Sequence, residues 1–200
     1  MRVVVATHNA HKVEELQRIL GAEVPGLELV AYDGPAPEED GDSFAANALI
    51  KARAAAAYTG LPAIADDSGI SVDALDGAPG IHSAYYSGAR DDAANVQHLL
   101  AELAALGEGA DRAARFTCAA ALVDPTIEGE AFETVELGVW PGAVTHAVAG
   151  GVGFGYDPVF IPEGLTVTSA EITADEKNAI SHRARAFAAL AVVLRARAEG

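Results

Sequence analysis

The chain has 200 residues, which suits one domain, and half of them are hydrophobic, which is ample for a sizeable core. A formal net charge of −16 argues against a nucleic-acid or anionic-membrane binder, because affinity for phosphate backbones depends on Lys and Arg. The single cysteine, Cys118, excludes an internal disulfide, and no apolar run is long enough for a membrane span or a signal peptide, so we expect a cytoplasmic protein.

The first half of the chain is expected to alternate strands with helices. Short apolar runs predict strands, and apolar residues that recur every three or four positions predict helices. A loop is expected at 33–42, where Pro, Gly and acidic residues gather. The predicted order is a strand at 3–6, a helix through 13–20, a strand at 27–31, a helix from the cap at 42–43 to 58, and a strand at 61–65.

The second half is expected to add a hairpin and a final helix. Val135, Leu137 and Val139 alternate with polar residues, the pattern of a half-buried strand, and 173–176 has the form of a capping box. We therefore predict an α/β fold with a long mixed sheet flanked by helices, in one domain over 1–200. The predicted elements are a strand at 70–72, a helix from 91 through 103, an antiparallel pair at 115–123 and 131–140, a strand at 159–161 and a helix from about 181 to 194.

Two adjacent acids, Asp66 and Asp67, stand where the apolar strand at 61–65 is expected to end. In open α/β sheets, ligands bind at the carboxyl ends of strands, where such a turn would lie. Side-by-side carboxylates raise each other's pKa, so a site that keeps both charged usually supplies a cation. The alternative is a solvated Asp-Asp turn, because Asp, Ser and Gly are ordinary turn residues.

Lysine is scarce in this chain, and the places of Lys12, Lys51 and Lys177 support an anion site. Lysine suits phosphate oxygens as a compact point charge, although a composition poor in lysine explains the pattern as well. The polar loop at 7–9 lies between a predicted strand and a predicted helix. Its backbone N–H groups would face a phosphate at the positive end of that helix.

The acidic loop ahead of the helix that bears Lys51 contains Glu39. If this loop folds over Asp67, the two carboxylates would share a magnesium ion, which favours carboxylates together with substrate phosphates. A solvated acidic loop is the alternative.

The glycine-rich segment 150–155 is not a dinucleotide-binding fingerprint, because its glycines do not fit G-x-G-x-x-G and a strand follows it. Phe154 and Tyr156 would offer faces on which a flat base stacks. The alternative is a tight turn that packs both rings into the core. Further along, His182 and Arg183 offer hydrogen-bond donors, although an exposed helical face explains the arginine as well.

Taken together, these motifs resemble the inosine/xanthosine triphosphate pyrophosphatase family over essentially the whole chain. The resemblance implies a homodimeric α/β protein with a long mixed sheet and a cleft between two lobes. It implies magnesium-dependent hydrolysis of ITP, dITP and XTP to the monophosphate and pyrophosphate. The motifs are, in order, Thr7-His8-Asn9 with Lys12, Phe44 with Asn47 and Lys51, Ala65-Asp66-Asp67-Ser68-Gly69, Gly77-Ala78-Pro79-Gly80, the segment 153–158 and Ser181-His182-Arg183.

The resemblance also implies roles for individual residues. Asp67 would be the general base that activates water, and Glu39 and Asp67 would hold Mg²⁺, with Asp66 as a further candidate ligand. Arg183 or His182 would donate to the purine 6-oxygen, which rejects the 6-amino group of adenine. The phosphates and sugar would contact Thr7, His8, Asn9, Ala10, His11, Lys12, Lys51 and Ser68. The rest of the nucleotide would lie among Phe154, Gly155, Tyr156, Asp157, Lys177, His182 and Arg183.

Three positions depart from the family pattern. His8 replaces a usual glycine, Ala46 replaces an acid that commonly precedes the Asn, and Tyr85 replaces a frequent arginine. Two other functions stay open from the residues alone. One is a magnesium-dependent hydrolase of phosphate monoesters with an aspartyl nucleophile, although its D-x-D arrangement is absent. The other is a nucleotide-binding dimer without catalysis, which the departures at His8 and Tyr85 motivate.

Overall fold

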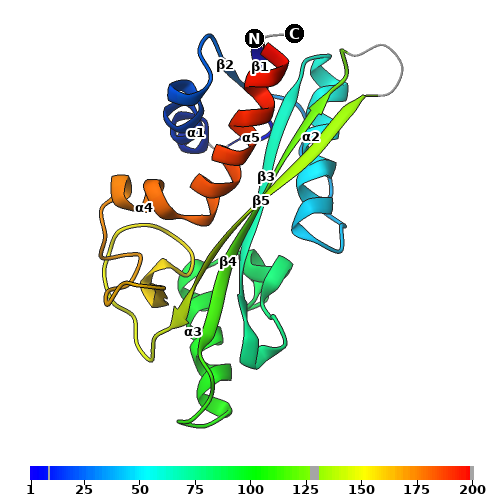
Figure 1. The fold of residues 1–200 in the computed structure, drawn as a ribbon. Coiled ribbons are helices and arrows are strands. Elements are labelled where there is room, and N and C mark those ends of the chain that lie inside the picture. Colours follow the sequence, from blue (N-terminus) through cyan, green and yellow to red (C-terminus); the bar gives the residue numbers. More distant parts are fainter. Residues whose placement is uncertain (9, 127–130, 199–200) are drawn as a thin grey trace. The chain divides into compact units, whose positions relative to one another are not determined.

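The computed structural model describes residues 1–8, 10–126 and 131–198, without the side chains of 10–12 and 14–15. The chain divides into two compact units (Figure 1). Unit 1 consists of residues 1–67, 118–138 and 183–200, and unit 2 consists of 68–117 and 139–182. The strands β3 (Ala63–Val72), β4 (Ala113–Asp124) and β5 (Phe132–Val144) contribute residues to both units.

The strands follow the order β2-β1-β3-β4-β5-β6. In unit 1, β1 (Arg2–Val5) pairs in parallel with β2 (Glu28–Ala31) and with the start of β3, where Val5 lies opposite Ile64. In unit 2, β5 pairs antiparallel with β6 (Phe160–Pro162). Parallel and antiparallel pairs occur together, so the predicted mixed α/β fold with flanking helices is confirmed.

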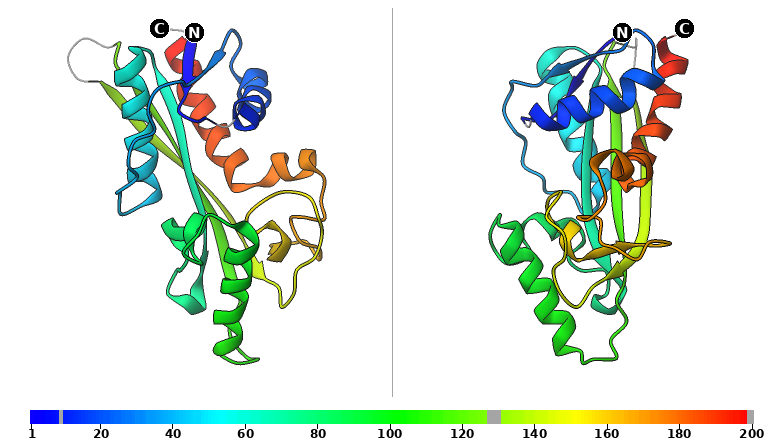
Figure 2. Two further views of the ribbon diagram at one scale, coloured as in Figure 1. Left: turned by 180° about the vertical axis from the view of Figure 1, so that it is seen from behind. Right: turned by 90° about the vertical axis from the view of Figure 1, so that its left-hand side faces the viewer.

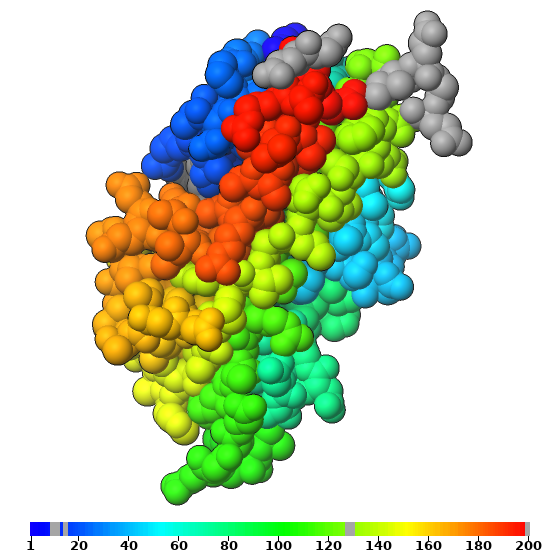
Figure 3. Space-filling model, viewed as in Figure 1, coloured from blue at the N-terminus to red at the C-terminus, as the bar shows by residue number. Residues whose placement is uncertain are grey.

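Helices cover both faces of the strands in unit 1 (Figures 1 and 2). On one face, α1 (Ala10–Glu23) and α5 (His182–Ala198) pack on a buried cluster that includes Ile64 and Cys118. The surface of unit 1 shows α5, in red, beside α1, in blue (Figure 3). On the other face lies α2 (Phe44–Thr59). Neighbouring residues of a strand point to opposite faces, so adjacent residues of β3 pack against different helices.

A seam of alanines joins α2 to the sheet. Its small side chains let the helix backbone approach the strands closely, and all of them are buried. The helix begins where the Ser43 hydroxyl accepts from the N–H of Ala46, and it ends at Gly60, whose φ of 66° suits glycine. The seam consists of Ala48, Ala52, Ala55 and Ala56 from α2 with Ala63, Ala65, Ala119 and Ala121 from β3 and β4.

Unit 2 has its own core, in which Ile70, Trp140 and Phe160 are buried together with the apolar stripe of α3 (Asp92–Ala105). The capping box predicted at 173–176 is confirmed at the start of α4 (Ala174–Ile180). Within the described residues, no helix combines the length and apolar character that crossing a membrane requires.

The predicted turn at Asp66 and Asp67 is wrong. The two residues lie inside β3, which runs without interruption into the segment expected to be a separate strand at 70–72. The strand that ends at this level is β1, whose chain keeps its pairing up to Ala6, where the N–H donates to the Ile64 carbonyl over 2.8 Å. The carboxylates therefore stand at the carboxyl end of β1, beside the point where that chain leaves the sheet.

Candidate active site

Three charged side chains meet in unit 1. The Lys51 ammonium on α2 donates to Glu39 Oε2 over 2.8 Å and to Asp67 Oδ1 over 3.0 Å. Asn47, one turn before Lys51 on the same helix, donates from Nδ2 to Asp67 Oδ2 over 3.4 Å. The Asn47 side chain also accepts from the N–H of Gly41 over 2.8 Å, which ties the acidic loop to α2. The structure thus brings Glu39, Lys51 and Asp67 together, so the loop folds toward Asp67, which the sequence analysis weighed against a solvated acidic loop.

Burial raises the pKa of Asp67, and the charge of Glu39 adds to the rise, while Lys51 and the Asn47 amide oppose it. Burial alone would lower the pKa of Lys51, but the charges of Asp67 and Glu39 outweigh it, so the pKa of the ammonium is raised. Lys51 is therefore a permanent cation, and Asp67 is a carboxylate with more proton affinity than a solvated one. That combination suits general-base chemistry.

The donor set fits magnesium. Both Glu39 and Asp67 direct an oxygen at one cation, the Lys51 ammonium, so the two carboxylates already converge. No group of three or more His, Cys, Asp or Glu that would enclose a metal occurs among the described residues. Magnesium is commonly held by one or two carboxylates and completed by substrate phosphates and water, so two converging carboxylates meet its need.

Asp66 lies on the other face of β3 and pairs with the first turn of α5. Its Oδ2 accepts from Arg183 Nη2 over 3.0 Å and from Arg183 Nε over 3.3 Å. Both side chains are almost fully buried. Asp66 and Asp67 thus carry neighbouring charges to opposite faces of one strand, which the sequence analysis did not anticipate.

The first loop is only partly described. Thr7 follows the end of β1, and the His8 ring lies against Tyr32 while its Nε2 is 2.9 Å from the Gly34 carbonyl oxygen. That oxygen can only accept, so His8 Nε2 carries the hydrogen. The contact joins the loop after β1 to the segment that leads to Glu39. Asn9 lies outside the described residues, and Ala10, His11 and Lys12 begin α1 with side chains outside that description.

In unit 2, the glycine-rich segment is organised around Asp157. Asp157 forms an ion pair with Lys177, and its Oδ2 accepts from the N–H of Phe154 over 2.9 Å. Its Oδ1 accepts from the Ser169 hydroxyl over 2.9 Å. Gly153 has a φ of 93°, and a Cβ there would collide with the Asp157 carboxylate. Asp157 therefore shapes the loop from inside.

The two aromatic residues of this loop have different fates. Phe154 is 58% exposed, and the Lys177 ammonium lies 4.8 Å from its ring centre. Tyr156 is buried in the unit 2 core, and its hydroxyl donates to the Ser83 carbonyl over 2.8 Å. Phe154 thus offers a ring at the surface, whereas Tyr156 packs inward, which is the alternative that the sequence analysis left open.

The remaining candidate residues, His182, Ser68 and Gly155, have separate surroundings. His182 is buried in unit 2, where its ring stacks on Phe116 at 4.8 Å between centres. Ser68 follows Asp67 in β3 and is half-buried. The N–H of Gly155 donates to Asp92 Oδ2 over 2.8 Å. Sequence reasoning missed Asp92, whose partner is 63 residues away, and gave no role to Asn47, although its place one turn before Lys51 was a usable signal.

The fold and this cluster define an α/β protein in which two carboxylates converge on one lysine. The Ham1 family model matches residues 3–193. A dITP/XTP pyrophosphatase of Leifsonia xyli subsp. xyli is 58% identical over 197 residues, which cover 98% of this chain and 96% of that relative. The chain therefore belongs to the Ham1 family, as the resemblance predicted.

Solved structures agree with this membership. A HAM1 protein from Coxiella burnetii superposes with a TM-score of 0.88 at 39% identity, covering 97% of this chain and 98% of that one. A nucleoside-triphosphatase / dITP/XTP pyrophosphatase from Mycobacterium abscessus gives a TM-score of 0.75 at 48% identity, covering 95% and 97%.

Proposed function

We propose that the protein hydrolyses dITP, XTP and ITP to the nucleoside monophosphate and pyrophosphate, with magnesium, and so removes non-standard purine nucleotides. At the coarser level, the chain is a nucleoside-triphosphate pyrophosphatase, a hydrolase of non-canonical purine nucleotides, by its family and its curated relatives. The observation that carries the finer proposal is the cluster of Glu39, Lys51 and Asp67.

Asp67 acts as the general base. Its carboxylate takes a proton from a water molecule, the water oxygen bonds to the α-phosphorus, and the bond from that phosphorus to the bridging oxygen breaks. Pyrophosphate leaves, and the monophosphate keeps the new oxygen. Lys51 places a positive charge beside this centre, where negative charge develops on the phosphate oxygens. Glu39 and Asp67 would hold the magnesium ion, which when bound neutralises charge on the triphosphate.

Arg183 is the donor that reads the purine 6-oxygen in this proposal. A guanidinium can donate and cannot accept, so it favours a 6-oxo group over the 6-amino group of adenine. His182 is the weaker candidate, because its ring is packed face to face on Phe116. Phe154, exposed and supported by Lys177, offers the stacking surface for the base.

Product analysis tests the reaction. Purified protein is incubated with dITP, XTP, ITP, GTP and ATP, with magnesium or with EDTA, and pyrophosphate is resolved from phosphate. We expect pyrophosphate from dITP, XTP and ITP in the presence of magnesium, and little product from ATP. Phosphate as the first product would favour the monoester hydrolase, and tight binding without turnover would favour the non-catalytic nucleotide binder.

We also propose a homodimer, on the resemblance stated above. Sedimentation equilibrium of the full chain measures the mass directly. A mass twice that of the 20.5 kDa chain is expected, and a monomer across the micromolar range would reject the proposal.

A further inference from the structure

We propose that Asp66 is a positioning residue that fixes the guanidinium of Arg183 and thereby sets the preference for 6-oxo over 6-amino purines. This inference rests on the proposed function, because it concerns how that function distinguishes its substrates. It also assigns Asp66 away from the metal, which the sequence analysis left as an option for this residue.

The two faces of β3 direct Asp66 and Asp67 toward different helices. Ala63 and Ala65 pack in the cluster beneath α2, and Ile64 packs in the cluster beneath α5. By the same alternation Asp67 faces α2, where it meets Lys51, and Asp66 faces α5, where it meets Arg183. The carboxylate of Asp66 is thus directed away from the converging oxygens of Glu39 and Asp67, so it is not part of that donor set.

The geometry of the Asp66–Arg183 pair restrains the guanidinium. One oxygen, Asp66 Oδ2, accepts from both Nε and Nη2 along one edge of the Arg183 guanidinium. The group is planar, so holding two nitrogens fixes its plane and the direction of its remaining nitrogen. With side-chain exposures of 6% for Asp66 and 7% for Arg183, burial strengthens this restraint.

Discrimination between 6-oxo and 6-amino purines needs a guanidinium of Arg183 that is held in place. A guanidinium held in place meets a 6-amino group donor to donor and cannot turn away, so the wrong base leaves two donors unpaired. A guanidinium that rotates freely can avoid the amino group and tolerates it better. Asp66 therefore acts on selectivity through Arg183, without touching the nucleotide.

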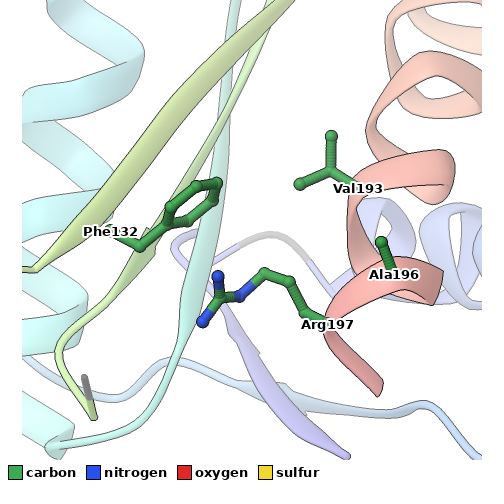
Figure 4. A pocket seen from close by; sticks show the side chains of 4 residues that line it. All are labelled: Phe132, Val193, Ala196 and Arg197. Carbon is green, nitrogen blue, oxygen red and sulfur yellow. The ribbon is translucent and has the colours of Figure 1, made fainter. Parts of the chain in front are cut away.

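The chain contains a matched control pair at the other end of α5. Asp124 Oδ2 accepts from Arg197 Nη2 over 2.7 Å and from Arg197 Nε over 3.2 Å, which is the same edge-on arrangement, with Asp124 as buried as Asp66. Arg197 also lies over the Phe132 ring, in a hollow that Val193 and Ala196 line on α5 (Figure 4). Arg197 follows Arg183 by fourteen positions, about 21 Å along α5.

The experiment compares Asp66→Asn with Asp124→Asn. For each variant, kcat/KM is measured with ITP and with ATP, together with the magnesium concentration at half-maximal rate and the Tm. For Asp66→Asn we expect the ITP/ATP ratio of kcat/KM to fall by about tenfold to a hundredfold, with the magnesium requirement unchanged. For Asp124→Asn we expect a lower Tm and an unchanged ratio.

Several results would overturn the inference. An unchanged ratio in Asp66→Asn would do so, as would an equal fall in Asp124→Asn, which would make the effect one of general stability. A higher magnesium concentration at half-maximal rate, with an unchanged ratio, would instead make Asp66 a metal ligand. If the wild-type protein releases no pyrophosphate from ITP, the proposed function itself fails, which is a separate outcome.

A second pair of variants covers the case in which Asp66→Asn does not fold. Asp66→Glu keeps the buried charge but moves the carboxylate by one methylene, and we expect a smaller fall of the same ratio. Combining Asp66→Glu with Arg183→Lys should lower the ratio no further than Arg183→Lys alone, because one acts through the other. Additive effects would contradict the inference.

Discussion

Among the described residues, each unit has a lysine–aspartate pair, and the two pairs differ in what else the carboxylate contacts. In unit 1, Asp67 is held by side chains of α2, Lys51 and Asn47. In unit 2, Asp157 accepts from a backbone N–H and a hydroxyl as well as from Lys177. A carboxylate bonded to backbone shapes a loop, whereas one bonded to side chains can exchange those partners for a metal ion or a water molecule. The proposed function thus gives the pair in unit 1 a chemical role, while the pair in unit 2 holds a loop together.

Asp67→Asn should have the largest effect on turnover of any variant of these two pairs. We expect kcat/KM for ITP to fall by about 10³-fold, because the amide cannot take a proton. The Tm should move by less than about 3 °C, since the amide loses the attraction of Lys51 but also the desolvation that raises the pKa of the carboxylate. Steady-state kinetics and a thermal melt of the same preparation check both. Turnover near the wild-type rate would remove Asp67 from the role of base.

Asp157→Asn should show the reverse pattern. Removing one partner of a nearly buried pair leaves the Lys177 charge uncompensated, and we expect a loss of about 3 kcal/mol in the free energy of unfolding. Urea unfolding measures it, and KM for ITP should rise more than kcat falls. Ser169→Ala is the control, because it removes a hydrogen bond worth about 1 kcal/mol. Full stability in Asp157→Asn would show that the loop does not depend on this carboxylate.

The Asp124–Arg197 pair of α5 should make stability depend on pH. Burial by itself would raise the pKa of Asp124. Hydrogen bonds from Thr126 and the charge of Arg197 outweigh burial and hold the pKa of Asp124 below its usual range. Because the folded pKa lies below the unfolded one, the stabilisation is present above about pH 4 and is lost as pH falls through the folded pKa. We expect Asp124→Asn to be about 1–3 kcal/mol less stable at pH 7, with the difference shrinking in acid. A difference that is constant from pH 7 to pH 2 would disprove the linkage.

The smallest expected effect belongs to His8→Gly, which restores the residue that the family resemblance implies. Loss of the contact with Gly34 should cost about 1 kcal/mol of stability and raise the half-saturating magnesium concentration by less than about fivefold, because Glu39 lies further along the tethered segment. His8→Ala separates the ring from the backbone freedom of glycine. Equal behaviour of both variants is expected, and a loss confined to His8→Gly would assign the effect to the backbone.

The fold could be predicted from the sequence because its helices and strands follow regular patterns of apolar residues. Apolar runs marked the strands, and capping residues such as Ser43 and Thr173 marked helix starts. The failure at Asp66 and Asp67 has a definite cause. Two acids after an apolar run match a turn by propensity, yet strand β3 continues because each carboxylate finds a cation, Arg183 or Lys51, on its own face. Such partners lie far along the chain, so local propensity cannot reveal them.

The site was readable in part. The sequence suggested that the loop with Glu39 could fold toward Asp67, and in the structure both carboxylates contact Lys51, a contact that the sequence did not indicate. The inward packing of Tyr156 and the hub role of Asp157 depend on contacts with Ser83, Ser169 and Lys177, which no spacing rule connects. The substrate contacts, the metal and the dimer stay predictions for the experiments above.

The alanine seam beneath α2 determines how firmly Asn47 and Lys51 are positioned. Alanine has no rotamers to lose, so the helix that carries Asn47 and Lys51 is fastened to the sheet without the side-chain entropy that larger residues forfeit. Almost every replacement there adds volume, and extra methylenes in a tight seam displace backbone. A library randomised at these positions should therefore yield folded proteins mainly through paired changes on helix and strand. In evolutionary terms, the packing beneath Lys51 can change only through coordinated substitutions on α2 and the strands.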